Sequence, residues 1–295
     1  MRKPVRNLGA SIRARLLNLA KERDQPFDLL LTRFALERLL YRLSISKHRD
    51  RFVLKGAMLM ATWFDDPHRP TRDLDLLGFG DANPESMRRV FREICLVKAD
   101  DAVAFDADDL TVDRIREETE YDGLRIKTKA AVDGARARVV IDIGFGDAIE
   151  PGLSEIELPV LLDQPAPHLR AYARETVIAE KFQAMVILGR ANSRMKDLYD
   201  IWLLSQTFEF KDDKLARAIA ATFRRRNTSI PSERPDALSR AFAEDATKQR
   251  QWTAFLGDVA VNPGSLAEII EDLAAFLMPH AEAAQTVSTV TDRNL

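Results

Sequence analysis

The spacing of hydrophobic residues changes along the chain, and each change predicts a different kind of secondary structure. In residues 11–44 apolar side chains recur three and four positions apart, which is typical of amphipathic helices. Short apolar runs at Phe52-Val53-Leu54 and in TRDLDLLGF, which starts at Thr71, indicate strands. Residues 84–96 return to helical spacing. The N-terminal part is therefore expected to alternate helices with strands.

The middle of the chain follows a period of two. The segments GLRIKTKAAV and ARARVVIDIGF flank Asp133-Gly134, a dipeptide that favours a tight β-hairpin turn. Beyond Pro167 the pattern is helical almost to the end. The expected fold class is α+β, with a small mixed sheet, flanking helices and a helical C-terminal half. We place the domains at residues 1–165 and 166–295.

Composition narrows the class of protein. The chain has 295 residues and a net charge of −2, which excludes a polybasic coat for unspecific nucleic-acid binding but allows a local basic patch. Cys95 is the single cysteine, so a disulfide scaffold is excluded and a reducing, cytoplasmic location is expected. The longest nearly apolar stretch, Ala57–Phe64, is far shorter than the ~20 residues needed to span a bilayer.

Two acids in TRDLDLLGF are the first candidates for chemistry. On a strand, Asp73 and Asp75 point to one face while Leu74 and Leu76 enter the core. Two neighbouring carboxylates repel each other unless a cation or a proton lies between them, and this pair suits Mg²⁺. The alternative is the solvated outer face of an edge strand, because D-x-D is short and common.

A third acid lies in a very apolar strand. Alternation sends Ile141 and Ile143 to one face and Asp142 to the other. If this strand lies beside the first, three carboxylates converge, an arrangement that supports two-metal phosphoryl transfer. The alternative is that Asp142 caps a turn or pairs with an arginine.

The helical half adds a lysine and two acids. Lys181 lies in the middle of the apolar stripe of its helix, so it must either extend to solvent or find an anion such as a triphosphate or a carboxylate cluster. Asp197 and Asp200 are three apart on one helical face and could pair with Lys181, or orient a nucleotide or metal. Earlier in the chain, Gly56 ends a strand and opens a helix, where backbone N–H groups can face phosphate oxygens, although a simple turn is the default.

The order of these motifs resembles a known family. KG at 55–56, D-x-D at 73–75, a strand aspartate at 142, EK at 180–181 and R-x-K-D-x-x-D at 194–200 look like the AbiEii/AbiGii toxin family of the nucleotidyltransferase superfamily, which includes the mycobacterial MenT toxins. The resemblance covers Phe52 to Trp202. It implies a nucleotidyltransferase-type sheet completed by the helical C-terminal domain.

The resemblance also implies roles for individual residues. The family pattern assigns catalytic roles to Asp73, Asp75, Lys181, Asp197 and Asp200, and metal ligation to Asp73, Asp75 and Asp142. It assigns nucleotide binding to Lys55, Gly56, Ala57, Arg72, Lys181 and Arg194. Ala57 stands where the family has a second small residue, Gly or Ser, which puts the phosphate-binding geometry there in question.

The implied activity is that of a cytoplasmic toxin in a toxin–antitoxin or abortive-infection system. It would use Mg²⁺ or Mn²⁺ to transfer a nucleotide from an NTP to RNA, such as a tRNA 3′ end, and so block translation. Its protein partner would be a winged-helix antitoxin, and no membrane partner is expected. One alternative is transfer to a protein or small-molecule hydroxyl. Another is a catalytically silent nucleotide-binding protein. We expect Asp73→Ala and Lys181→Ala to abolish transfer and leave the chain folded.

An RNA acceptor requires a basic surface, and two clusters are candidates. The first is near the N-terminus and the second is at a helix end. Such clusters are more often a solvated face or a helix C-terminal charge. Their members are Arg2, Lys3, Arg6, Arg13 and Arg15, and Arg224, Arg225 and Arg226.

Overall fold

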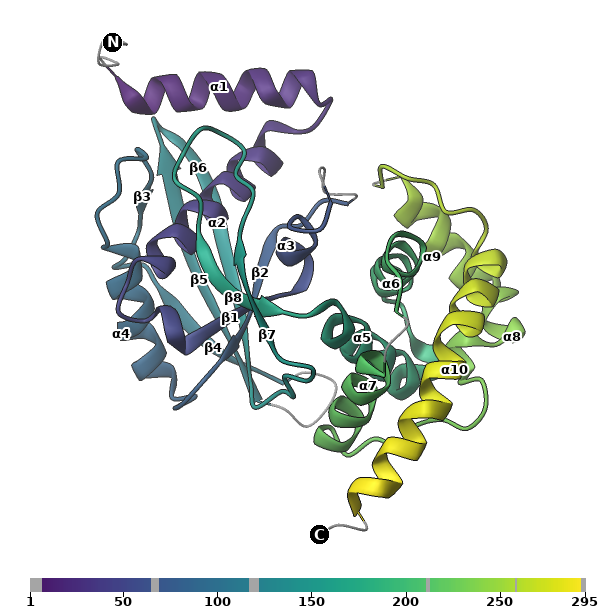
Figure 1. Cartoon of the computed structure of the whole chain (residues 1–295). Coiled ribbons are helices and arrows are strands. Elements are labelled where there is room, and N and C mark those ends of the chain that lie inside the picture. Colours follow the sequence, from purple (N-terminus) through teal and green to yellow (C-terminus); the bar gives the residue numbers. More distant parts are fainter. Residues whose placement is uncertain (1–6, 65–68, 117–121, 211–212, 258, 293–295) are drawn as a thin grey trace. The chain divides into compact units, whose positions relative to one another are not determined.

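The structure is a computed structural model that describes residues 7–64, 69–116, 122–210, 213–257 and 259–292. The chain divides into two compact units. Unit 1 contains residues 1–146 and 155–171, and unit 2 contains residues 147–154 and 172–295. Each unit is described by itself below, with the element labels of Figure 1.

Strands belong to the first part of the chain, and most helices belong to the second. The strands are β1 (Phe52–Lys55), β2 (Asp73–Gly78), β3 (Ala104–Phe105), β4 (Thr111–Arg116), β5 (Asp122–Val132), β6 (Ala135–Phe145), β7 (Leu153–Glu157) and β8 (His168–Tyr172). The helices are α1 (Leu8–Glu22), α2 (Phe27–Ser44), α3 (Gly56–Met60), α4 (Pro84–Cys95), α5 (Arg174–Leu188), α6 (Met195–Thr207), α7 (Lys214–Arg225), α8 (Arg240–Ala243), α9 (Ala246–Leu256) and α10 (Leu266–Asp292). Short 3₁₀ turns occur at Arg49–Arg51, Gly189–Ala191 and Asp236–Leu238.

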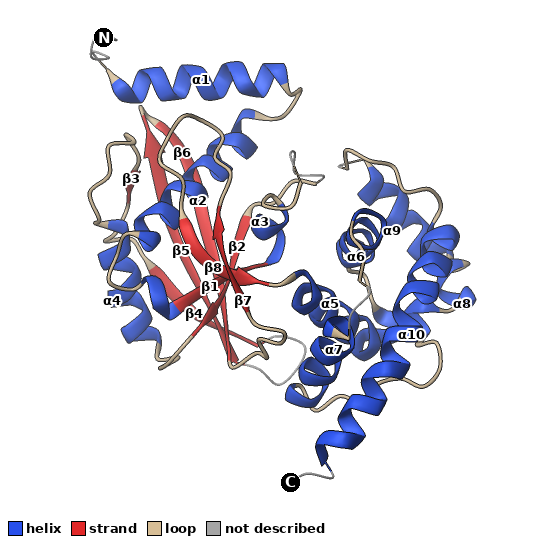
Figure 2. Ribbon diagram, in the orientation of Figure 1, coloured by secondary structure: helices blue, strands red, loops and turns tan. Residues whose placement is uncertain are grey.

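Within the described residues the strands form one mixed sheet in the order β3-β5-β6-β2-β1-β8-β7, with β4 also paired to β5 (Figure 2). Strand β2 is antiparallel to β1 and parallel to β6. This register places Asp75 opposite Lys55 on one side and opposite Asp142 on the other. The α+β class, the mixed sheet and the helical C-terminal part expected from the sequence are confirmed.

The hairpin forms as its turn sequence predicts. Asp133 and Gly134 both adopt positive φ, of 45° and 80°, which a two-residue type I′ turn requires. The turn fixes the register of β5 against β6 along the whole ladder, from Val132 opposite Ala135 to Leu124 opposite Ile143. Helix α1 lies beside the hairpin end in Figure 1, where Arg13 Nη1 donates to the carbonyl of Asp133 at 3.5 Å. The turn and the contact with α1 therefore hold β5 and β6 in one register.

One face of the sheet of unit 1 is apolar and packs on helices. Ile126, Val139 and Ile141 are fully buried there. Helix α2 packs on β6, and it buries Phe34 and Leu36 among its own residues. Burial of these side chains stabilises the unit by ~1.5–3 kcal/mol each, before the entropic cost of ordering them. The other face of β2 and β6 is thereby left to the polar side chains.

Unit 2 is built from helices that share an apolar interior. Helix α5 packs against α7 through Phe182 and Phe223, whose ring centroids are 5.5 Å apart, and α10 packs against α6 and α7. Among the described helices, including the long α10, none combines enough length and apolar character to cross a membrane.

The sequence analysis did not predict strands β7 and β8, because five-residue strands carry little periodic signal.

Candidate functional site

Asp73, Asp75 and Asp142 share the polar face of the sheet. Strands β2 and β6 run parallel with Asp75 directly opposite Asp142, and Asp73 is opposite Val140 on the same face. The apolar residues between them, Leu74 and Ile141, point into the core. The predicted convergence of three carboxylates is therefore what the topology produces. We call these three residues the carboxylate face.

Arg125 on β5 neutralises part of this face. Its Nε donates to Asp142 Oδ1 and its Nη2 donates to Asp142 Oδ2, each at 2.7 Å. The hydrogen bond to Asp142, with the charges of Asp142, Asp73 and Asp75 added, raises the pKa of Arg125 above its ordinary value. The arginine alternative that the sequence left open for Asp142 is thus realised, because both carboxylate oxygens accept from the guanidinium.

Sequence reasoning missed Arg125, although a signal was present. Counting outward from the Asp133-Gly134 turn pairs Val132 with Ala135 and, further along the ladder, Arg125 with Asp142. A cross-strand partner of a strand aspartate can therefore be read directly from a two-residue hairpin.

Gly56 makes room for Asp75. It begins α3 with φ of 70°, and a Cβ atom added there would come within 2.6 Å of Asp75 Cγ. Lys55, the cross-strand partner of Asp75, precedes it and is buried. Gly56 thus has a steric role that the sequence did not indicate, while its role toward phosphate stays a prediction.

The remaining predicted nucleotide-binding residues of unit 1 lie near these acids in sequence. Ala57 is the second residue of α3 and is partly exposed. Arg72 precedes β2, and its Nη1 donates to Asp28 Oδ2 at 2.8 Å across an exposed ion pair. Arg72 and Asp73 both line a cavity of about 410 Å³. Asp73 is therefore open to a ligand.

In unit 2, Lys181 and the two acids of α6 form a buried cluster. Lys181 Nζ lies 2.7 Å from Asp197 Oδ1 and 2.8 Å from Asp200 Oδ2. Both carboxylate side chains are 1% exposed and the lysine is 12% exposed. Arg194 Nε donates to the other oxygen of Asp197 at 2.6 Å. The sequence interpretation that both acids pair with Lys181 is confirmed, and we call these four residues the lysine–aspartate cluster.

The charges in this cluster decide the protonation of Asp197. Burial acts to raise the pKa of Asp197, but the charges of Lys181 and Arg194 and the hydrogen bond from Lys181 outweigh it. The pKa therefore lies below the ordinary 3.8, and Asp197 is ionised at neutral pH. An ionised Asp197 holds the lysine ammonium in one place.

A second buried polar network in unit 2 involves Arg226. Its Nη2 lies 3.0 Å from Asp147 Oδ1 and 3.3 Å from Glu180 Oε1, and its side chain is 8% exposed. The hydroxyl of Tyr172 donates to Glu180 Oε1 at 3.2 Å. The prediction that Arg226 contributes to a basic surface is wrong, because its guanidinium forms ion pairs with two acids inside the unit.

The other members of the predicted basic clusters differ in placement. Arg224 is exposed at the end of α7. Arg13 lies near Asp133, and Arg15 pairs with Asp163. Arg2, Lys3 and Arg6 lie outside the described residues.

The carboxylate face suits a divalent cation that takes two protein ligands better than one that is coordinated by protein ligands alone. Across the described ranges, no three His, Cys, Asp or Glu side chains are arranged to hold a metal ion. Mg²⁺ usually takes only one or two carboxylates and completes its shell with water and substrate phosphates. Asp73 and Asp75 meet that requirement on a single strand face. Both oxygens of Asp142 already accept from Arg125.

A mixed sheet with two aspartates on one strand face offers the acidic metal ligands that nucleotidyl transfer uses. A family model described as nucleotidyl transferase AbiEii toxin of the type IV toxin–antitoxin system matches residues 38–278. The chain therefore belongs to the AbiEii family of toxin nucleotidyltransferases. The family assignment made from the motifs is confirmed, and the match extends beyond Trp202 through most of the helical half.

Solved structures show the same fold. One is a protein from H. pylori assigned as a nucleotidyltransferase, with a TM-score of 0.51, 15% identity, and coverage of 88% of this chain and 96% of that chain. Another is JHP933 from Helicobacter pylori, with a TM-score of 0.50, 14% identity, and coverage of 90% and 97%. No curated protein is similar enough to count as a relative.

Proposed function

We propose that this toxin uses a divalent metal ion to transfer a nucleotide from an NTP to RNA, with a tRNA 3′ end as the acceptor. The observation that carries the proposal is the carboxylate face, on which Asp73 and Asp75 project together beside Asp142 in a chain of the AbiEii family. The RNA acceptor rests on the family resemblance of the motifs. Blocked translation would be the toxic effect.

The reaction is a substitution at phosphorus. The acceptor hydroxyl oxygen forms a bond to the α-phosphorus of the NTP, the bond from that phosphorus to the bridging oxygen breaks, pyrophosphate leaves and the hydroxyl proton passes to solvent. Such reactions need positioning and charge neutralisation more than covalent help from the protein. Mg²⁺ or Mn²⁺ held by Asp73 and Asp75 would neutralise phosphate charge and lower the pKa of the attacking hydroxyl.

Asp142 has a positioning role in this proposal. Its two hydrogen bonds fix the guanidinium of Arg125 on the polar face that carries Asp73 and Asp75. A fixed cation there limits the repulsion between the acids before substrate binds. Direct metal ligation by Asp142 stays a prediction, and each of its oxygens keeps a second lone pair beside the hydrogen bond from Arg125.

The lysine–aspartate cluster supplies the proposed phosphate contact of unit 2. Lys181 is the family position for that contact, and Asp197 and Asp200 hold its ammonium at 2.7 and 2.8 Å. A lysine anchored by two acids loses little side-chain entropy when it meets an anion. Asp197 and Asp200 would thus act through Lys181, and Arg194 would hold Asp197 in turn.

The cellular setting follows from the substrates. NTPs and tRNA are cytoplasmic, so we place the protein there. A type IV toxin has a cognate antitoxin, for which we propose a winged-helix repressor that controls expression.

The test is incubation of the purified chain with total RNA, Mg²⁺ and each α-radiolabelled NTP in turn, resolved on a denaturing gel. We expect label in a tRNA-sized band with the wild type and none with Asp73→Ala. The matched control is Asp100→Ala, an exposed acid of the same unit that should transfer like the wild type. Label on protein, or on no macromolecule with any NTP, would overturn the RNA acceptor.

A further inference from the structure

The hairpin carries a row of basic residues on the same side of the sheet as the carboxylate face. In β5 these are Arg125, Lys127 and Lys129, and in β6 they are Arg136 and Arg138. Cross-strand pairing puts Arg125 opposite Asp142 and Lys129 opposite Arg138, so alternation directs all five side chains to one face. We call these five residues the basic strip.

The strip is exposed because the opposite face takes up the apolar residues. Ile126, Val139 and Ile141 are fully buried, whereas Lys129, Arg136 and Arg138 are exposed. Five cations therefore gather on one hairpin of a chain whose net charge is −2. A charge asymmetry of this kind is a local feature that composition alone hides.

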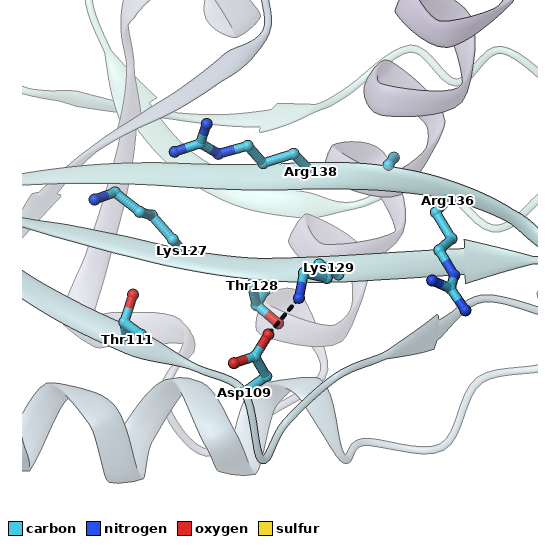
Figure 3. Close-up of a pocket in the computed structure, with 8 residues that line it drawn as sticks. Asp109, Thr111, Lys127, Thr128, Lys129, Arg136 and Arg138 are labelled. Atoms are coloured by element: carbon cyan, nitrogen blue, oxygen red, sulfur yellow. Dashed lines mark hydrogen bonds and ion pairs between the residues drawn. The ribbon is translucent and has the colours of Figure 1, made fainter.

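Three hollows follow the strip. The cavity of about 410 Å³ that contains Asp73 is also lined by Arg125, Arg136 and Arg138. A cavity of about 540 Å³ is lined by Lys127, Lys129, Arg136 and Arg138, as Figure 3 shows. A third, of about 350 Å³, is lined by Lys129 and Arg136. Arg136 borders all three, and the first of them also contains Asp73.

Not all of these cations are neutralised within the chain. Arg125 pairs with Asp142 and Lys127 with Asp113, each at 2.7 Å. Lys129 pairs with Asp109 at 2.6 Å, an interaction marked in Figure 3. Arg136 and Arg138 form no ion pair with any residue that the structure describes. With Arg136 and Arg138 on its wall, the cavity that holds Asp73 is lined by more cationic than anionic side chains, which favours an anionic ligand there.

We propose that the basic strip holds the phosphate backbone of the acceptor RNA and leads its reactive end to Asp73. From Arg125 to Ala131, the partner of Arg136, the strip is about 20 Å long at the rise of a β-strand. That length and the repeated single charges suit successive phosphates of a chain rather than one triphosphate. The inference rests on the proposed function, and it replaces the two basic clusters considered from sequence.

The experiment compares the double variant Arg136→Glu, Arg138→Glu with the double variant Arg88→Glu, Arg89→Glu. The second pair makes the same charge change at exposed positions of α4 that line none of the three cavities. The full chain is titrated against fluorescently labelled total tRNA over a series of KCl concentrations, followed by anisotropy. The KM values for tRNA and for the NTP are measured in parallel by nucleotide transfer.

We expect the strip variant to bind tRNA at least about tenfold more weakly, with a salt slope reduced by about 1.4 for two lost phosphate contacts to a single strand. Its KM for tRNA should rise while its KM for the NTP and its Tm stay unchanged. The α4 variant should match the wild type in every measurement. Equal losses in both double variants, or no loss in either, would overturn the inference.

Failure of the inference is separable from failure of the proposed function. Wild-type transfer to RNA together with unchanged tRNA binding by the strip variant would overturn the strip and keep the RNA acceptor. Binding of tRNA that depends on the strip, with no transfer by the wild type, would keep the surface and overturn the transfer reaction. Absence of both binding and transfer would overturn both.

Discussion

The carboxylate of Asp75 occupies the space that any side chain at Gly56 would need. A Cβ at position 56 would lie 2.6 Å from Asp75 Cγ, and the backbone there has φ of 70°, where side chains are strained. The Asp75 side chain on β2 thus packs directly against the backbone of Gly56 at the start of α3. The glycine that the sequence predicts to face phosphate therefore also leaves the space that an acid needs.

Gly56→Ala should therefore displace Asp75 and abolish nucleotide transfer. The backbone strain and the overlap together should lower the free energy of unfolding by about 1–3 kcal/mol. Gly80→Ala is the matched control, because Gly80 has φ of 89° and open space around its Cβ position. It should share the strain and keep the activity. Transfer and urea denaturation measure the two effects, and an active Gly56→Ala variant would contradict the steric role.

Arg125 and Asp142 should show energetic coupling. A double-mutant cycle of Arg125→Ala and Asp142→Ala should give about 1 kcal/mol, since the pair is bidentate but the arginine side chain is 41% exposed. Each single variant should also weaken transfer, because Arg125 would leave its place beside Asp73 and Asp75. Urea denaturation with and without Mg²⁺ gives the coupling. A coupling near zero, with Mg²⁺ stabilisation lost only in Asp142→Ala, would favour Asp142 as a metal ligand instead.

Lys181→Ala should abolish transfer and also destabilise the chain. The sequence-based expectation of an intact fold needs revision, since Lys181 neutralises two acids whose side chains are 1% exposed. Loss of the ammonium group that pairs with both buried acids should cost about 3–5 kcal/mol. Lys181→Ala combined with Asp197→Asn and Asp200→Asn should recover much of the stability and none of the activity. Circular-dichroism melts would reveal this, and an unchanged Tm in the single variant would argue against the buried cluster.

The stability that Asp197 contributes should depend on pH in one direction. Its pKa is lowered in the folded state, so the unfolded chain takes up the proton at a higher pH than the folded chain does. The contribution is complete above the ordinary pKa of 3.8 and is lost as the pH falls through the lower folded value. Urea midpoints of the wild type and of Asp197→Asn should therefore converge below about pH 4. A gap that stays constant into acid would show that the pKa is not lowered.

Arg226→Ala should destabilise unit 2 rather than weaken RNA binding. Its loss leaves Asp147 and Glu180 without the cation that lies 3.0 and 3.3 Å from them, at a cost of about 2–4 kcal/mol. Arg224→Ala, an exposed neighbour from the same arginine run, should leave the Tm unchanged. Thermal melts and tRNA anisotropy separate the two roles, and normal stability with weaker tRNA binding would restore the basic cluster.

Local patterns in the sequence were enough to predict the secondary structure and to identify the acids. Alternation assigned Asp73, Asp75 and Asp142 to polar strand faces, and the Asp133-Gly134 turn set the register of the hairpin. Helical spacing placed Lys181 on a buried stripe, where it needed an anion. These features depend on neighbours within one element or one hairpin, so a periodic pattern or a turn dipeptide is enough to predict them.

Which residues become neighbours of these acids and of Lys181 depends on the tertiary fold. The parallel pairing of β2 with β6 brings Asp75 opposite Asp142, although the two residues are far apart in the sequence. The same holds for the overlap between Gly56 and Asp75, and for the burial of Arg226 among acids. No local pattern encodes contacts between distant segments, because they depend on how whole elements pack and on which charges burial forces to pair.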